Sequence, residues 1–290
     1  FDLVRSTIVM AILSLGCMMV IISGGIDVSF TAIACFSMFT TIKLLVPHDY
    51  QGSILLLFVI AAVIGLILGL INAVFISYFK LPTLIVTLGT QNMYRGFMLA
   101  FIGAQKVSTL PVCMIDFSRT YLIKITQKGA IYGLHIGLII FIVAAIFVSF
   151  LLRRTMLGRG IYALGGDITA AERVGFNIRA IQFFIYGFVG FLAGVAGIIQ
   201  CSFIRTAQPF DLVGSEMNVI AAVVLGGTSI TGGHGTVTGT ILGIILVVII
   251  TNSLILLGIS PFWQQATLGT LILIGTGIPA LRDRYKQKNM

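Results

Sequence analysis

The sequence predicts an all-α polytopic membrane protein, and three observations lead to that fold class. Of its 290 residues, 58% are hydrophobic and only 9% are charged, whereas soluble domains carry roughly 25% charged residues. Mean hydropathy is +1.10. The hydrophobic residues gather in stretches close to the roughly 20 residues that a helix needs to cross the hydrocarbon core. So few charged groups could not cover a water-facing surface.

Nine membrane segments are predicted within a single transmembrane domain that covers residues 1–290. Three of them are interrupted: the first ends in "SGGIDVS", the fourth begins at Pro82 and carries Arg95, and the seventh runs into "LGGTSITGGHG". Broken backbone at membrane depth persists only where protein or a water-lined cavity satisfies its polar groups. Such interruptions are typical of transporters. The nine segments are 6–23, 29–46, 52–78, 82–103, 130–152, 182–204, 216–231, 236–257 and 262–281.

The distribution of Lys and Arg predicts which loops face the cytosol, because cytoplasmic loops carry an excess of these residues. We place the loop 153–181 inside, since its basic residues are dense. The inner side then holds Lys80, Arg153, Arg154, Arg159, Arg173, Arg179, Arg282, Arg284, Lys286 and Lys288. The outer side holds Arg5, Lys43, Lys106, Arg119, Lys124, Lys128 and Arg205, so the bias is modest. The net charge of +9 therefore indicates topology, and nucleic-acid binding is not expected.

A weak internal similarity suggests an inverted repeat. "GLILGLI" at 65–71 resembles "GTILGII" at 239–245, and "TLGT" occurs at both 87–90 and 267–270. In the predicted topology the two copies run in opposite directions, a common plan among transporters. Chance similarity is the alternative in a chain with 33 Gly.

Metal, disulfide and nucleotide sites find no support in the sequence. The cysteines and histidines are scattered without ligand spacing, so the cysteines are expected to be small packing groups. The stretch "GGTSITGGHGT" at 226–236 lacks the Lys of a phosphate-binding loop and is expected to be a break between two spans. No paired catalytic residues occur, so an enzyme is not expected. The scattered residues are Cys17, Cys35, Cys113, Cys201, His48, His135 and His234.

Six polar residues within or beside the segments are candidates for a solute path: Asp27, Asn72, Asn92, Arg95, Glu216 and Asn218. Ionisable groups in a membrane are costly and often functional. However, Asp27 and Glu216 each stand where a helix is expected to start, so capping and the helix dipole also explain them. Asn72 and Asn218 could hydrogen-bond a polyol or a neighbouring helix. Arg95, near Asn92 and Gln91, fits a path or an ion pair within the bundle.

A short polar helix is predicted within 165–177, "GGDITAAERVGFN". Asp167 or Thr169 could cap it and Gly175 could end it, because Gly is favoured just past a helix. It is either a solvated connector or a partner-binding helix, since a short amphipathic helix with a small apolar face fits a groove on another protein.

Four longer motifs contain many of these residues: "SGGIDVS" (23–29), "LPTLIVTLGT" (81–90), "LGRGIYALGGDITAAERVGFNI" (157–178) and "AQPFDLVGSEMNVIAAVVLGGTSITGGHGTVTGTILG" (207–243). They resemble a known family, the permease subunits of bacterial ABC importers for simple sugars. The type includes ribose, xylose, arabinose, galactose and autoinducer-2 permeases. The similarity covers nearly the whole chain. Two features depart from the family: Asn218 replaces a frequent acidic residue, and 104–129 is unusually basic.

The resemblance implies ten helices in an inverted repeat, so that one helix before Phe1 is expected to be missing. It implies a second permease, which is either another copy or a paralogue, two cytosolic ATPase subunits, and a periplasmic or lipid-anchored sugar-binding protein. ATP and Mg²⁺ would bind the ATPases, with no cofactor on this chain, in the bacterial inner membrane. The loop 153–181 would carry the coupling helix that docks on the ATPase. The residues carried over to that role are Gly165, Gly166, Asp167, Ala170, Ala171, Glu172, Arg173 and Gly175.

The resemblance thus implies import of a sugar or sugar-like solute, driven by ATP on the partner subunits. An ion-coupled secondary transporter is the alternative, although few acidic residues lie at midspan. The sequence leaves the identity of the solute open.

Overall fold

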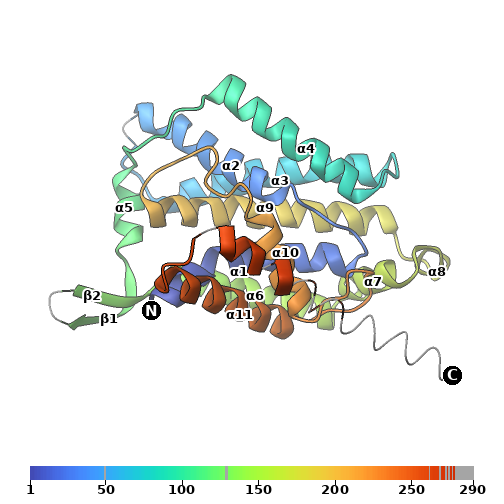
Figure 1. The fold of residues 1–290 in the computed structure, drawn as a ribbon. Coiled ribbons are helices and arrows are strands. Elements are labelled where there is room, and N and C mark those ends of the chain that lie inside the picture. The colour runs from blue at the N-terminus through green and yellow to red at the C-terminus, as the bar shows by residue number, and fades with distance from the viewer. Residues whose placement is uncertain are drawn as a thin grey trace.

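The computed structural model describes residues 1–48, 50–127, 130–260, 262–267, 269–271, 273, 275 and 277. In this part of the chain most residues are helical, and the helices run roughly alongside one another (Figure 1). The elements are α1 (Asp2–Ile22), α2 (Phe30–Leu45), η1 (Val46–His48), α3 (Ile54–Ser77), α4 (Thr83–Phe97), η2 (Met98–Ile102), α5 (Val112–Ser118), β1 (Tyr121–Gln127), β2 (Ala130–His135), α6 (Gly137–Arg154), α7 (Met156–Gly166), α8 (Ile168–Arg173), α9 (Ile178–Ile204), α10 (Glu216–Leu225) and α11 (Val237–Leu256).

Helices α1 and α9 form the centre of the bundle. The elements α2, α3 and α4 lie on one side of them, and α6, α10 and α11 lie on the other (Figure 1). The main apolar core is one continuous cluster built largely from α1, α2 and α9. The bundle has two distinct ends: the hairpin β1–β2 projects from one, and α8 projects from the other (Figure 1).

Within the described residues, six helices are long and apolar enough to cross a membrane, which confirms a mostly helical, multi-pass membrane protein. They are Leu3–Ile22, Phe30–His48, Ile54–Ser77, Gly137–Arg154, Ile178–Ile204 and Val237–Leu256. The fourth predicted segment corresponds to α4 and η2, and the seventh to the ten-residue helix α10. The predicted ninth segment, 262–281, lies partly outside the described residues, as do Lys128 and the basic tail 282–288.

The prediction of a membrane segment from residue 130 is wrong at its start. Ala130–His135 forms strand β2, which pairs antiparallel with β1, and helix α6 begins only at Gly137. A short apolar run before a glycine fits a strand as well as a helix by its periodicity. The preceding polar and β-branched run 121–127 supplies the partner strand, and pairing decides the outcome.

Glycines allow α3 and α9 to cross in backbone contact. A Cβ added at Gly65 would meet the Gly190 carbonyl oxygen, and one at Gly190 would meet the Gly65 carbonyl oxygen. One turn further along each helix, Gly194 faces the Ala61 carbonyl oxygen and Gly69 faces the backbone of α9. Small residues at four-residue spacing permit this approach in membrane bundles, where van der Waals packing drives association.

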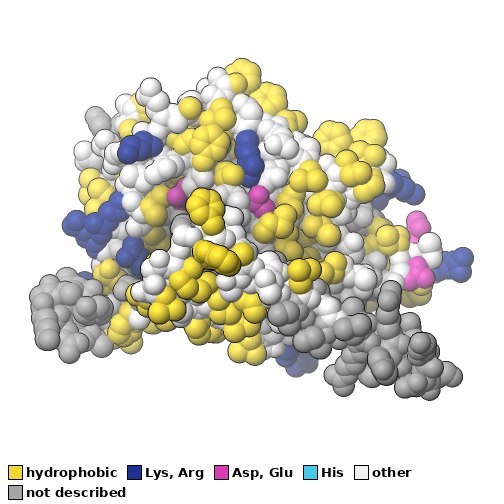
Figure 2. Space-filling model, in the orientation of Figure 1, with side chains coloured by type: hydrophobic (Ala, Val, Ile, Leu, Met, Phe, Trp, Pro, Cys, Tyr) yellow, Lys and Arg dark blue, Asp and Glu magenta, His cyan; other side chains and the backbone are white. Residues whose placement is uncertain are grey.

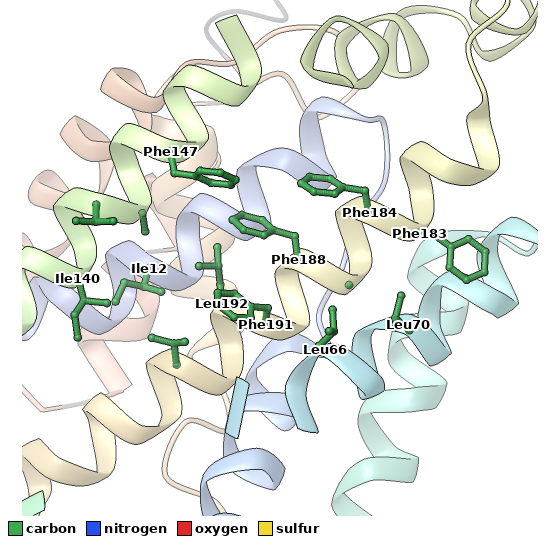
Figure 3. Close-up of a pocket in the computed structure, with 14 residues that line it drawn as sticks. Ile12, Leu66, Leu70, Ile140, Phe147, Phe183, Phe184, Phe188, Phe191 and Leu192 are labelled. Carbon is green, nitrogen blue, oxygen red and sulfur yellow. The ribbon is translucent and has the colours of Figure 1, made fainter. Parts of the chain in front are cut away.

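A groove of about 780 Å³ runs between α1, α3, α6 and α9. Figure 3 shows Phe147 on α6 facing Phe184 and Phe188 on α9, with Leu66 of α3 on the other side. Every side chain that lines the groove is apolar. A hydroxyl-rich solute would lose its hydrogen bonds to water there without replacement, so this groove suits hydrocarbon and not a polar solute.

The surface also fits a membrane location. On the face in Figure 2, hydrophobic side chains cover much of the middle, and charged side chains gather mainly toward the two ends. The side chains of Leu55, Val63 and Ile67 on α3 and of Val143 and Ile146 on α6 are all exposed. Many large apolar side chains exposed on two helices indicate a protein or membrane contact.

Candidate functional site

The break after α1 is held against the first two turns of α4. Helix α1 ends at Ile22, and Gly24 takes a left-handed backbone conformation with φ of 81°. The Ile26 amide donates a hydrogen bond to Thr83 Oγ1 at 3.0 Å, and Thr87 Oγ1 donates to the Ile26 carbonyl at 3.3 Å. The Thr83 and Thr87 side chains thus form hydrogen bonds with backbone groups of the break that have no partner within α1 or α2. A break buried in a membrane protein requires such partners.

A buried polar cluster follows directly from this break. Asp27 is 1% exposed, and its Oδ1 accepts hydrogen bonds from the Ser29 amide and the Ser29 hydroxyl, both at 2.7 Å. Asn72 of α3 donates to Ser29 Oγ at 2.8 Å. Tyr94 of α4 donates to the Leu68 carbonyl at 2.8 Å and lies 3.3 Å from Asn72 Oδ1. These contacts join the break to α3 and α4 through groups that water does not reach.

Glu216 is the centre of a second polar cluster. At the start of α10, its carboxylate accepts hydrogen bonds from Thr31 Oγ1 at 3.1 Å, Gln91 Nε2 at 3.2 Å and the Gly214 amide at 2.9 Å. An Arg95 guanidinium nitrogen lies 3.7 Å from Glu216 Oε1. This is the one salt bridge among the described residues. The cluster links α2, α4 and α10.

Both clusters share helix α4, which carries a polar stripe along its inner face. Thr83, Thr87, Gln91 and Tyr94 recur every three or four residues, and Arg95 follows. That spacing puts them on one side of an α-helix. Gln91 and Arg95 were predicted as a polar cluster from the sequence, whereas Thr83, Thr87 and Tyr94 were not, although their spacing is visible in "TLIVTLGTQNMYR".

The structure brings four of the six candidate path residues into these clusters. Asp27 and Asn72 belong to the first cluster, and Arg95 and Glu216 to the second. Asn92 is exposed on the opposite side of α4, and its side chain donates only to its own helix, to the Leu88 carbonyl at 2.9 Å. Asn218 is half-buried, and no side-chain hydrogen bond joins it to another described residue.

Glu216 is the first residue of α10, the position at which the helix dipole favours an acidic side chain, as predicted. The predicted capping is not observed, because the bond that Glu216 accepts from Gly214 lies before the helix and the N-cap residue Ser215 makes no side-chain capping bond. The same carboxylate also pairs with Arg95. Asp27 accepts a backbone hydrogen bond from Ser29, the residue just before α2, and Ser29 itself makes no side-chain capping bond at the start of α2. The ion pair predicted as one possibility for Arg95 is therefore present.

The predicted short helix is α8, and its cap is confirmed. Asp167 Oδ1 accepts hydrogen bonds from the Thr169 amide at 2.8 Å and the Ala170 amide at 3.1 Å. Hydrogen bonds from the Thr169 hydroxyl and from these two amides hold the pKa of the Asp167 carboxyl below its ordinary value. After the helix, Gly175 adopts φ of 94°, a conformation that glycine enters without strain.

Helix α8 presents a mixed surface at the end of the bundle. Glu172 and Arg173 are exposed, as are Ile168 at 53% and Val174 at 78%. Ala171, by contrast, is only 4% exposed and faces the protein's own interior. The apolar groups that this helix offers outward are therefore Ile168 and Val174, together with exposed Ala170, and not the Ala170–Ala171 pair that the sequence suggested.

Among the described residues, no group of three or more His, Cys, Asp and Glu side chains lies close enough to hold a metal ion. All four cysteines are free, and three of them are buried. His135 accepts the Gly137 amide at 2.9 Å and so stabilises the turn into α6.

Comparisons with known proteins agree with the predicted family. Ribose import permease RbsC of Bacillus subtilis is 32% identical over 293 residues, which cover 98% of this chain and 84% of the relative. The Haemophilus influenzae RbsC is 31% identical over 285 residues, with the same coverage. The autoinducer 2 import permease LsrC of Yersinia enterocolitica is 32% identical over 267 residues, or 92% of this chain and 71% of the relative. No solved structure is significantly similar.

The model of one family, described as "Branched-chain amino acid transport system / permease component", matches residues 1–275. Because that match covers nearly the whole chain, and because the relatives align along almost all of it, the chain belongs to this family of membrane permease components.

Proposed function

We propose that this chain is the membrane-spanning subunit of an ATP-driven importer for a simple sugar or sugar-like solute. The observation that carries the proposal is the capped helix α8, which projects from one end of the bundle with Glu172, Arg173, Ile168 and Val174 exposed. Such a helix with charged and apolar groups suits a groove on a partner. In this family an ATPase subunit is the partner expected at that position.

Polar groups on α4 support a hydroxyl-bearing solute. Gln91, Arg95 and Glu216 supply donors and acceptors within the bundle, whereas the large groove between α1, α3, α6 and α9 has none. The family description names branched-chain amino acids, but the relatives reported above are ribose and autoinducer 2 permeases. A path lined by hydroxyl, amide and charged groups matches a polyol better than an aliphatic side chain.

We propose further that the path is completed by a second permease. Asn92 is exposed on the outer face of α4, beside Gly89 and Gly96, where no atom lies within 4 Å of an added Cβ. An exposed amide in the hydrocarbon region is costly unless it meets protein or water.

The complete complex that we propose also contains two ATPase subunits, which bind ATP and Mg²⁺, and an external sugar-binding protein. It would act in a bacterial inner membrane.

The arrangement of ten helices in an inverted repeat remains part of the proposal. Of the similar stretches, 65–71 lies in α3, 239–245 in α11 and 87–90 in α4, whereas 267–270 lies partly outside the described residues. Helix α3 runs toward the α8 end, because Tyr78 after α3 lies against Arg179 at the start of α9. Helix α11 runs away from that end, because Gly235 before α11 bonds to Tyr162 of α7. The opposite directions support a repeat that is inverted.

The test is uptake of radiolabelled D-ribose by proteoliposomes that contain this chain, its ATPase subunits and its binding protein. Uptake should require ATP inside. Exchanging the charges through Glu172→Lys with Arg173→Glu should abolish uptake and ATPase association, with membrane insertion unchanged. Arg154→Glu, an exposed charge at the end of α6, is the control and should retain both.

Three other results would each refute part of the proposal. Normal uptake by the charge-exchanged protein would refute the docking role of α8. Uptake that collapses with an ionophore while ATP persists would favour an ion-coupled secondary transporter. Uptake of leucine in place of ribose would retain the importer but refute the sugar.

A further inference from the structure

Three backbone segments meet directly behind α8. They are the end of α1 with the break that follows it, the end of α7, and the glycine-rich loop 226–236. The Gly233 amide donates a hydrogen bond to the Ile22 carbonyl at 2.9 Å, and Tyr162 of α7 donates to the Gly235 carbonyl at 2.8 Å. The loop therefore bonds to both helices at this point.

Only glycine fits at the centre of this meeting point. A Cβ at Gly165 would strike the Ile22 carbonyl oxygen. A Cβ at Gly232 would lie 2.6 Å from the Gly165 carbonyl oxygen and 2.9 Å from the Gly24 Cα. These atoms belong to the backbone and cannot swing aside, unlike the end of a side chain. We name the set Gly24, Gly165, Gly232 and Gly233 the glycine junction.

The glycine junction is continuous with α8 on one side. Gly165 and Gly166 are the last residues of α7, and the next residue, Asp167, caps α8. Ala171 is buried against the protein, so α8 rests on the bundle as well as being joined to it by the chain. A displacement of α8 is therefore transmitted to Gly165 through only two intervening residues, Gly166 and Asp167.

On the other side, the junction is continuous with the polar stripe of α4. Gly24 is followed by Gly25, where an added Cβ would lie 2.8 Å from the Tyr186 hydroxyl of α9. Ile26 then bonds to Thr83 and Thr87, the first two threonines of the stripe. Close packing without intervening side chains allows these elements little displacement relative to one another, because protein interiors have low compressibility.

We propose that the glycine junction transmits movement of α8 to α4, so that Gly165 and Gly232 are positioning residues for coupling ATP hydrolysis to transport. The inference rests on the proposed function, since α8 must be moved by an ATPase. It adds a physical route: backbone contacts carry a displacement from α8 through residues 22–27 to the helix that bears Gln91 and Arg95. Coupling between sites travels through packed elements of this kind.

The chain offers a matched pair of substitutions to test the junction. Gly232→Ala and Gly227→Ala both introduce a Cβ into the same loop at positive φ, 90° and 87°. Gly232 faces the backbone of two other segments, whereas no atom lies within 4 Å of an added Cβ at Gly227. Local backbone strain is thus equal in the two variants, and only the inter-segment contact differs.

The measurement is the ratio of ribose transported to ATP hydrolysed in the reconstituted complex. Gly232→Ala should lower that ratio by at least about fivefold, within the range expected for changes along a coupling network. ATPase association should persist, because the α8 surface is unaltered. Gly227→Ala should keep the wild-type ratio. A merely structural defect would reduce the amount of active complex and lower both activities together, leaving the ratio unchanged.

Equal ratios for the two variants and the wild type would overturn the inference. Should Gly232→Ala fail to insert, Tyr162→Phe decides instead: it removes one hydroxyl, and with it the hydrogen bond from α7 to the Gly235 carbonyl beside the junction, and it adds no atom. A reduced ratio in Tyr162→Phe supports transmission, and an unchanged ratio refutes it. Absence of ATP-driven uptake by the unaltered protein would refute the proposed function itself, whereas equal ratios in an active complex refute the junction alone.

Discussion

Replacing Glu216 by glutamine tests whether its carboxylate holds three helices together. The substitution keeps the size and shape of the side chain but removes its charge. Thr31, Gln91 and the Gly214 amide would then donate to a neutral oxygen or face an amide NH₂, and the Arg95 guanidinium would lose its counter-charge.

The expected loss follows from the geometry of the pair. Removing one partner of a buried ion pair costs about 3–5 kcal/mol, because a charge is left uncompensated. Here the side chains of Arg95 and Glu216 keep 21% and 12% exposure, and the separation of 3.7 Å is long for a charged hydrogen bond. Partial solvation and weak geometry lower the cost, so Glu216→Gln should reduce the free energy of unfolding by about 2–3 kcal/mol.

A double-mutant cycle isolates the ion pair. Arg95→Met alone should also destabilise, but adding it to Glu216→Gln should cost much less than the sum, with an interaction energy of about 1–3 kcal/mol. The assay is reversible denaturant unfolding in detergent micelles. Glu172→Gln, at an exposed site, is the control and should change stability by less than about 0.5 kcal/mol. Strictly additive losses, or a stable Glu216→Gln protein, would refute the reasoning.

Three further outcomes are expected from the same structure. Gly190→Ala should lower the free energy of unfolding in detergent by about 1–3 kcal/mol, because the added methyl group forces α9 away from α3. Gly89→Ala, whose added methyl group meets no neighbour, is the control and should not lower it. Equal effects of the two substitutions would contradict the backbone contact. Tyr94→Phe should cost about 1–2 kcal/mol of unfolding free energy, because it removes the buried hydroxyl that donates to the Leu68 carbonyl. The exposed control Tyr78→Phe should cost almost nothing. The pKa of Asp167 is depressed in the folded protein, so its ionised carboxylate stabilises α8 at neutral pH. A spin label on α8 should therefore gain mobility as the pH falls through that pKa. Mobility independent of pH would argue against the cap.

The elements that sequence could predict are those specified by local chemistry. The long apolar runs became α1, α2, α3, α9 and α11, because a stretch of that length and composition has one stable form in hydrocarbon. Helix α8 was predictable for another local reason: Asp167 can reach two amides of the first turn only if a helix follows, and Gly175 tolerates the positive φ that ends it.

The elements that sequence missed depend on partners distant in the chain. Whether 130–135 is strand or helix depends on β1, and whether Arg95 meets solute or an acid depends on where Glu216 arrives. The inward direction of Ala171 depends likewise on how α8 rests on the bundle, which composition cannot specify. Each of these outcomes is a tertiary contact imposed on a locally ambiguous segment.

The three segments predicted from the sequence to be interrupted lie in contact with one another in the structure. The break "SGGIDVS" touches the loop within "LGGTSITGGHG" at Gly24 and Gly232, and it bonds to the start of α4, just after Pro82, through Ile26 and Thr83. Irregular backbone in a membrane has to be satisfied by protein, and here the irregular segments largely satisfy one another. Placed together, they connect the chain segment just before α8 to the first turns of α4 through direct backbone contacts and hydrogen bonds. Such a continuous connection would let movement of α8 at one end of the bundle displace α4, which an importer driven from that end requires.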